Sequence, residues 1–259
     1  MIAVLALLLF AAPRVVWIAA CAVCATVAAF EWARLTQLGR PATAAFIGLT
    51  ALPVASWPLV EPSLASAGNL FLGITAFWLI LVPFWLWRHA VPKAPAFSFV
   101  AGVLVIGSAS LAAVALRDAG SWLLLCVMGV VWLSDSMAYF VGSAIGRHKL
   151  APRISPGKTW EGAAGALVSV VIYALAWGYL SSGILPERYT AGPAAWLALT
   201  GVMSLLAVMG IYGDLFESFL KRASGVKDSG SILPGHGGAL DRIDALLPVL
   251  PLAAWLFAR

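Results

Sequence analysis

The chain has 259 residues, of which 62% are apolar and 10% charged, and its mean hydropathy is +0.97. These values exclude a soluble domain, which would expose far more lysine and glutamate. Apolar runs of about 17–25 residues recur, and this length is needed to cross a bilayer as a helix. The net charge of +5 does not indicate a nucleic-acid partner, because basic residues here are better interpreted by their position relative to the membrane. The composition predicts an all-α polytopic integral membrane protein.

About nine transmembrane helices are expected, separated by turn and charge signals. The start of the chain lacks the basic segment of a signal peptide, so a retained first span is the better interpretation. The expected spans are 1–12, 15–33, 42–60, 69–87, 96–116, 121–145, 160–181, 194–213 and 243–258.

The distribution of lysine and arginine predicts the orientation of these spans. Twelve of the 16 cations fall in connections 34–41, 88–95, 147–158 and 214–242, which lie on one side if nine spans alternate. The other side holds Arg14, Arg117, Arg188 and Arg259. Cytoplasmic connections carry an excess of cations. The N-terminus and the four basic connections are therefore expected in the cytoplasm.

Charge also divides the single expected membrane domain into two parts. Residues 1–133 carry nine charges and no dense motif, which is typical of a membrane scaffold, whereas 134–259 are expected to form the catalytic half. Cys21, Cys24 and Cys126 all lie in apolar runs, so packed thiols are favoured over a metal or redox site.

The segment from Asp214 to Asp244 holds nine of the 27 charged residues in 31 positions. Asp214, Glu217, Ser218 and Lys221 have the spacing that places four side chains on one face of a helix. Leu215, Phe216, Phe219 and Leu220 would then cover the other side. Carboxylates suit Mg²⁺, cations suit phosphate, and glycines allow close approach of the backbone to an anion. The alternative is a solvated cytoplasmic loop. It explains the cations but not the acids at helical spacing or the Gly-His-Gly-Gly sequence at 235–238.

A second polar stretch begins inside an expected span. Asp135 is an ionisable residue in an apolar run, with Tyr139 one turn further on. The alternative for Asp135 is a helix-end acid bonded to a neighbouring span. Residues 154–162 resemble a fragment of a phosphate loop without its first glycine, and they also fit a helix cap by Ser155 or Thr159, with Glu161 near the helix N-terminus. Both interpretations stay open, since a helix N-terminus beside Lys158 also attracts phosphate.

The order and spacing of these residues resemble the signature of the phosphatidate cytidylyltransferase (CDP-diacylglycerol synthase) family. The matching residues run through Asp135-x-x-x-Tyr139, then 154–162, then Gly213-Asp214, and finally Ser218-x-x-Lys221-Arg222-x4-Lys227-Asp228 with Leu233-Pro234-Gly235-His236-Gly237-Gly238-x-x-Asp241-Arg242-x-Asp244. The motifs cover roughly residues 134–250, which makes the resemblance highly specific.

The resemblance implies a nucleotidyltransferase that converts CTP and phosphatidate into CDP-diacylglycerol and pyrophosphate with Mg²⁺, in phospholipid biosynthesis. It implies a second divalent or a monovalent ion as an open alternative to one Mg²⁺, and Asp214 and Asp241 as the metal ligands. The implied catalytic residues are Asp214, Asp241, Lys227, Asp228 and Asp244. The implied substrate-binding residues are Asp135, Tyr139, Ser155, Lys158, Thr159, Glu161, Ser218, Lys221, Arg222, His236, Gly237, Gly238 and Arg242.

The expected partners are CTP, phosphatidate, membrane lipid and a second copy of the chain, with no nucleic acid. The expected location is the bacterial inner membrane, with the active site facing the cytoplasm. The main rival is a related CTP-dependent transferase acting on another lipid, similar to a CDP-archaeol synthase or a polyprenol kinase. An ion-coupled transporter is less favoured, because its acids would be spread near the middle of the bilayer.

Overall fold

The computed structural model describes residues 2–60, 67–88, 95–180, 185–230 and 237–257. Helices dominate, as the composition predicts, and six of those described are long and apolar enough to cross a membrane. They are α2 (Arg14–Leu35), α5–η1–α6 (Gly68–Arg88), α7–η2–α8 (Pro95–Ala119), α9 (Ser121–Ile145), α10 (Trp160–Leu180) and α11 (Pro193–Ala223).

Two of the six contain a short π-helical stretch and are therefore not uniform α-helices. The first consists of α5 (Gly68–Ala76), η1 (Phe77–Leu81) and α6 (Val82–Arg88). The second consists of α7 (Pro95–Gly102), η2 (Val103–Gly107) and α8 (Ser108–Ala119). Such π turns occur mostly as single-turn insertions inside α-helices.

The other helical elements are shorter than a full span. They are α1 (Ile2–Phe10), α3 (Arg40–Ala55), α4 (Trp57–Val60), the 3₁₀ turn η3 (Glu187–Tyr189), α12 (Leu240–Ile243) and α13 (Leu246–Phe257). Each of the nine expected ranges contains helix, but only six pass the length and hydropathy test. A multi-pass helical protein is thus confirmed, whereas the count of nine and the orientation of the N-terminus stay predictions.

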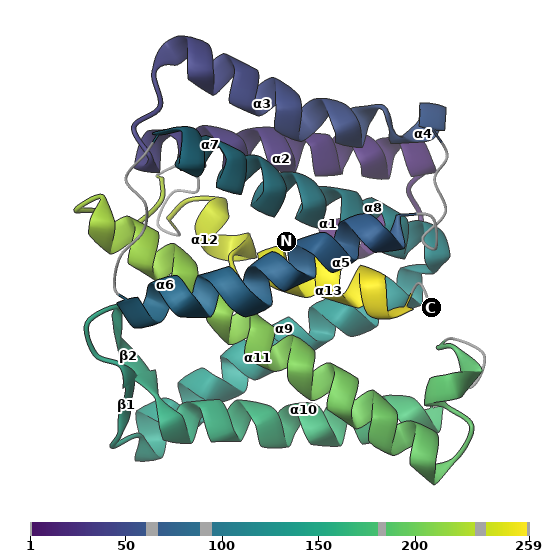
Figure 1. Cartoon of the computed structure of the whole chain (residues 1–259). Helices are drawn as coiled ribbons and strands as arrows, with labels where there is room; N and C mark the ends of the chain where they lie inside the picture. Colours follow the sequence, from purple (N-terminus) through teal and green to yellow (C-terminus); the bar gives the residue numbers. More distant parts are fainter. Residues whose placement is uncertain (1, 61–66, 89–94, 181–184, 231–236, 258–259) are drawn as a thin grey trace.

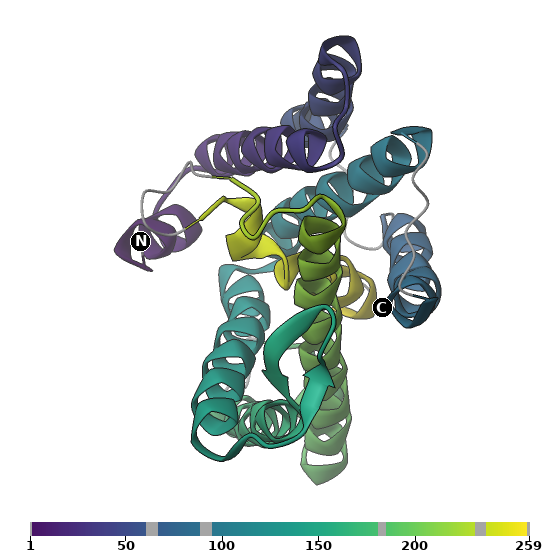
Figure 2. The same cartoon turned by 90° about the vertical axis from the view of Figure 1, so that its left-hand side faces the viewer.

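The polar connections gather at one end of the helical bundle. In Figure 1 the turn between α2 and α3, the end of α6, the β-hairpin and the last turns of α11 all lie toward the left-hand end. Figure 2 views the molecule from that end and places the hairpin in front of α9, α10 and α11. The cation-rich connections of the sequence therefore share one end of the fold.

A two-stranded sheet is the one departure from all-helical structure in the described ranges. Strands β1 (Lys149–Ala151) and β2 (Ser155–Thr159) pair antiparallel, with Lys149 opposite Thr159. Pro152 and Pro156 disfavour helix across this segment, because proline restricts both itself and the residue before it. The hairpin was not expected from the sequence, and it carries Lys158 to the base of α10.

The last helix, α13, lies inside the bundle rather than at its edge. Almost every side chain from Leu246 to Ala254 is buried, and the helix contacts α5, α8 and α11 (Figure 1). Gly213 of α11 allows α13 to approach, because a side chain there would collide with the Asp244 carbonyl and sit 2.8 Å from the Pro248 ring. This packing fixes the segment that precedes α13, which contains Asp241 and Asp244.

Candidate active site

Helix α11 continues about ten residues past the expected end of its span, to Ala223. The predicted polar face is confirmed: Ser218 Oγ donates to Asp214 Oδ1 at 3.3 Å, and Lys221 Nζ donates to Glu217 Oε2 at 2.6 Å. The predicted apolar face is also buried, and the Phe216 ring contacts the rings of Trp32, Trp78 and Trp85. Aromatic packing on one face thus sets the direction of the acids on the other.

Asp214, the N-terminal acid of this face, belongs to a group of three carboxylates and one lysine. Lys158 Nζ of β2 lies 2.5 Å from Asp214 Oδ2. Asp135 of α9 interacts electrostatically with both of these residues, and Asp244 interacts with all three. We call Asp135, Lys158, Asp214 and Asp244 the Asp214 cluster. It contains three carboxylates and one ammonium group, so it carries excess negative charge when ionised.

The pKa of Asp244 is raised by its position in the Asp214 cluster. Burial and then the negative charges of Asp214 and Asp135 raise the pKa of Asp244 from 3.8 to about 7, although the Ala245 N–H, 2.7 Å from Asp244 Oδ1, opposes the shift. A carboxyl whose pKa is raised by neighbouring acids is a position where a cation would be stabilised.

A second group surrounds the other acid of the signature, and most of its carboxylate oxygens accept hydrogen bonds from the protein. Asp241 Oδ1 accepts a hydrogen bond from Lys221 Nζ at 2.6 Å. Asp241 Oδ2 accepts from Gly238 N at 2.8 Å and from the backbone N and Oγ of Ser229, both at 3.0 Å. Burial alone would raise the pKa of Asp241, but these hydrogen bonds, led by that of Lys221, lower it to about 2.

A buried acid from the first half of the chain completes this group. Glu31 of α2 has no exposed side-chain surface. Its carboxylate accepts hydrogen bonds from Ala239 N at 3.0 Å, Leu240 N at 2.8 Å and Ser229 Oγ at 3.0 Å. We call Glu31, Glu217, Lys221, Ser229 and Asp241 the Asp241 cluster. Through Glu31, the scaffold half of the chain directly holds the segment from Asp214 to Asp244, which we call the signature segment.

Two glycines shape the backbone between Ser229 and Asp241. Gly237 has φ of 79°, in the left-handed region that glycine adopts without strain. A side chain on Gly238 would collide with Ser229 Oγ and with the Glu31 carboxylate. The glycines expected to permit close approach to an anion are therefore also needed for the approach of two protein side chains.

The hairpin residues of the signature are tied to the start of α10. Thr159 Oγ1 accepts a hydrogen bond from Gly162 N at 3.1 Å, which confirms the expected helix cap at Thr159. Glu161 Oε1 lies 2.6 Å from His148 Nδ1, and its carboxylate also accepts from His148 N at 3.2 Å. These contacts hold the strand that carries Lys158 against the end of the bundle.

Other predicted site residues lie further from these contacts. The Tyr139 side chain is 71% exposed and contacts the Phe140 ring, and Ser155 is half-buried on β2. Arg222, Lys227, Asp228 and Arg242 are exposed. His236 lies outside the described residues. The assignment of these residues to substrate contacts stays a prediction.

Sequence reasoning missed Glu31 and Ser229 and left Glu217 out of the site. The signal for Glu31 was present, because an ionisable residue inside an apolar span is a functional candidate, as it was for Asp135. Glu217 is 1% exposed, and its Oε1 atom makes no hydrogen bond within the described part of the chain. Ser229 had no distinguishing spacing, and only the fold places it between Glu31 and Asp241.

The donor set at this end fits a hard divalent cation completed by substrate. In the ranges the structure describes, no three His, Cys, Asp or Glu side chains form a complete metal site. Mg²⁺ does not require one, because it usually takes one or two protein carboxylates together with substrate phosphates and water. The excess negative charge around Asp214, together with the unbonded Glu217 Oε1, matches that requirement.

Comparison with known proteins is consistent with this geometry. The phosphatidate cytidylyltransferase of Haemophilus influenzae is 34% identical over 254 residues, covering 88% of this chain and 85% of that protein. The one from Pseudomonas aeruginosa is 39% identical over 246 residues, covering 88% and 82%. The one from Bacillus subtilis is 46% identical over 129 residues, covering 50% and 45%. The model described as "Cytidylyltransferase family" matches residues 1–258, so the chain belongs to the cytidylyltransferase family and is a nucleotidyltransferase of the membrane.

Proposed function

We propose that this protein transfers the cytidylyl group of CTP to phosphatidate, forming CDP-diacylglycerol and pyrophosphate. The observation that carries the proposal is the Asp214 cluster, which combines three carboxylates with Lys158 at the polar end of a membrane bundle. The names of the relatives, which share 34–39% identity over most of the chain, supply the substrate class.

In this reaction a phosphate oxygen of phosphatidate attacks the α-phosphorus of CTP. A new P–O bond forms, the bond between the α- and β-phosphates breaks, and pyrophosphate takes the electron pair. The protein contributes mainly position and charge neutralisation, as in phosphoryl transfer generally. Lys158, held by Asp214 at 2.5 Å, is placed to neutralise a phosphate oxygen at the level of the lipid headgroups.

The exposed cations extend this neutralising surface away from the membrane. Arg222 lies in the last turn of α11, and Lys227 and Arg242 lie near the two ends of the signature segment. Arginine binds phosphate through two parallel hydrogen bonds, which suits a triphosphate. We assign these three side chains to CTP and pyrophosphate, and Tyr139 and Ser155 to the lipid side.

Asp214 is the principal proposed ligand for Mg²⁺, with Asp244 beside it. Asp241 is the second ligand that the family resemblance implies. In this structure its carboxylate forms an ion pair with Lys221. When bound, a divalent cation would supply charge stabilisation to the attacking and leaving phosphate oxygens. Whether one divalent ion suffices, or a second divalent or a monovalent ion assists, stays part of the proposal.

We place the reaction at the cytoplasmic face of a bacterial inner membrane. The polar connections with most of the cations share one end of the bundle, and cytoplasmic connections are the basic ones. CTP is a cytosolic substrate, so this orientation brings it to the lipid phosphate. A homodimer is also proposed, from the resemblance alone.

The decisive experiment incubates purified protein with labelled CTP, phosphatidate and Mg²⁺ and then extracts the lipids. Label in the lipid phase and release of pyrophosphate are expected. Parallel reactions with an ether-linked archaeal lipid phosphate and with a polyprenol test the rival transferases. A folded sample that labels neither phosphatidate nor the rivals would reject cytidylyl transfer to lipid, and preferential labelling of a rival would replace the substrate.

A further inference from the structure

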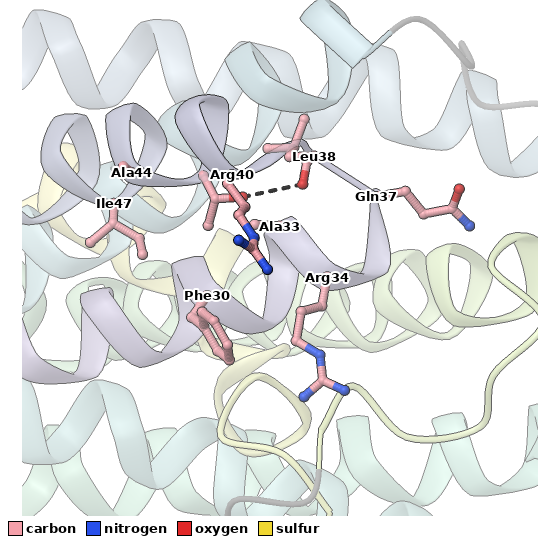
Figure 3. A pocket seen from close by; sticks show the side chains of 9 residues that line it. Phe30, Ala33, Arg34, Gln37, Leu38, Arg40, Ala44 and Ile47 are labelled. Carbon is pink, nitrogen blue, oxygen red and sulfur yellow. Dashed lines mark hydrogen bonds between the residues drawn. The ribbon is translucent and has the colours of Figure 1, made fainter.

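A cavity of about 550 Å³ lies between α2 and α3. Its walls are largely apolar and include Phe30, Leu38, Ala44 and Ile47. Figure 3 shows Arg40 pointing from the start of α3 toward α2, and Arg34 pointing away from α3 at the end of α2. The site therefore combines an apolar groove with two exposed cations at its edge.

Both arginines are exposed. In the part of the chain that the structure describes, no carboxylate forms an ion pair with either of them. Arg34 instead lies over the Phe30 ring, 5.9 Å from its centroid. This contact holds the guanidinium beside the apolar wall and leaves its donors available.

The start of α3 adds the positive end of a helix dipole, although Pro41 in its first turn has no backbone N–H to donate. Gly39 occupies the N-cap and has no side chain that could accept hydrogen bonds from the first turn of the helix. Thr43 Oγ1 donates to Leu38 O at 3.3 Å and to Gly39 O at 3.1 Å, which fixes the turn that leads into the helix. The partial positive charge of the helix N-terminus thus lies beside the arginine that begins it.

We propose that the α2–α3 cavity binds the phosphate headgroup of an anionic phospholipid through Arg34 and Arg40. The positive-inside rule explains arginines at this end of the bundle but not an apolar groove between them. A lipid matches both properties, because its phosphate meets the cations while its glycerol and upper acyl chains lie along the groove. This site is separate from the proposed reaction centre.

The position of the cavity connects it to the Asp241 cluster. Arg34 and Gln37 also line a second cavity of about 360 Å³, which is bordered by Asp228, Ser229 and Gly230. Ser229 bonds to both Glu31 and Asp241, and Glu31 lies one helical turn before Arg34 on α2. A bound headgroup would therefore hold the part of α2 that supports the signature segment.

The test measures lipid binding by native mass spectrometry of delipidated protein titrated with phosphatidylglycerol or phosphatidylcholine. The wild type is expected to prefer phosphatidylglycerol. The double variant R34Q/R40Q is expected to bind it roughly 30-fold more weakly, as expected for loss of two cations near a headgroup. The matched control R88Q/R153Q removes two exposed arginines from the same end and should bind as the wild type does.

A second variant tests the apolar groove without changing the charge of the site. Ala44→Phe fills the groove without changing the charge and should also weaken phosphatidylglycerol binding. Four results would overturn the proposal: equal binding of the two lipids, an equal loss in R88Q/R153Q, full displacement of lipid by inorganic phosphate, or a dimer-to-monomer shift in R34Q/R40Q. The last would indicate a second copy of the chain as the occupant. None of these readouts depends on the transfer reaction.

Discussion

The two acidic ends of the signature segment each have three carboxylates and one lysine, but they differ in how many hydrogen bonds the protein donates to those carboxylates. Around Asp214, three carboxylates share Lys158, and the pKa of Asp244 is raised to about 7. Around Asp241, one carboxylate accepts four hydrogen bonds from described residues, and its pKa is lowered to about 2. The carboxylates around Asp241 are therefore largely hydrogen-bonded by the protein, except at Glu217 Oε1, whereas those around Asp214 have Lys158 as their cationic partner among the described residues.

This difference separates two roles that the spacing of the acids could not distinguish. A cluster with excess negative charge lowers its free energy by binding a cation, so the Asp214 cluster suits Mg²⁺ and the phosphates it accompanies. Carboxylates that accept hydrogen bonds from the backbone stabilise its conformation, so the Asp241 cluster suits positioning of the glycine segment. The comparison predicts different effects of equivalent substitutions.

Asp214→Asn is expected to give the largest loss. Removal of the carboxylate charge should lower kcat by roughly 1000-fold, since electrostatic stabilisation of the transition state is lost. The unfolding temperature should change less than in Asp241→Asn, because relief of the repulsion with Asp244 offsets the lost ion pair with Lys158. Lipid labelling and thermal unfolding in detergent measure the two effects. Glu187→Gln, an exposed acid outside both clusters, is the control, and near-normal turnover of Asp214→Asn would remove Asp214 from the metal site.

Asp241→Asn is expected to abolish turnover as well, without preventing membrane insertion, but it should also destabilise the fold. Lys221 would lose one of its two carboxylate partners, and Ser229 and Gly238 would lose a charged acceptor. A lower unfolding temperature than that of Asp214→Asn is the expected signature. An unchanged unfolding temperature would mean that the hydrogen bonds of Asp241 do not hold the segment, and near-normal turnover would remove Asp241 from the metal site.

Glu31→Gln tests whether the first half of the chain supports the site. The amide nitrogen of glutamine would face the backbone N–H of Ala239 or Leu240, so one buried donor would lose its acceptor. The expected cost is about 1–3 kcal/mol of unfolding free energy. Activity should fall through poorer positioning, seen as a lower kcat at an unchanged dependence on Mg²⁺ concentration. A changed Mg²⁺ dependence would instead make Glu31 a participant in metal binding.

The smallest expected effect is a pH dependence of stability in protein free of divalent ions. The folded-state pKa of Asp244 is raised above 3.8, so the folded state holds a proton that the unfolded state releases between those values. The Asp244 contribution to stability should therefore fall as pH rises toward about 7 and stay constant above it. Unfolding temperatures between about pH 5 and 8 measure this trend. Asp244→Asn should flatten it, and an equal slope in that variant would assign the trend to another group.

Part of this site could be predicted from local sequence alone. The spacing of Asp214, Glu217, Ser218 and Lys221 predicts a shared helix face, and the structure confirms it, since helical periodicity is a local property. The cap at Thr159 was predictable for the same reason. The hairpin at 149–159 was not, because its short strands carry no alternating apolar pattern and are stabilised by pairing.

The sequence by itself determined a multi-pass helical membrane protein, the family to which it belongs, and the segment that carries its charge. These follow from hydropathy, periodicity and ordered motifs, each of which is read along the chain. Only the tertiary structure decided that Glu31 supports the backbone next to Asp241. It also decided that Asp135, Asp214 and Asp244 lie close enough to interact electrostatically. The physical reason is that charge balance depends on distances between helices far apart in sequence, and those distances are set by packing.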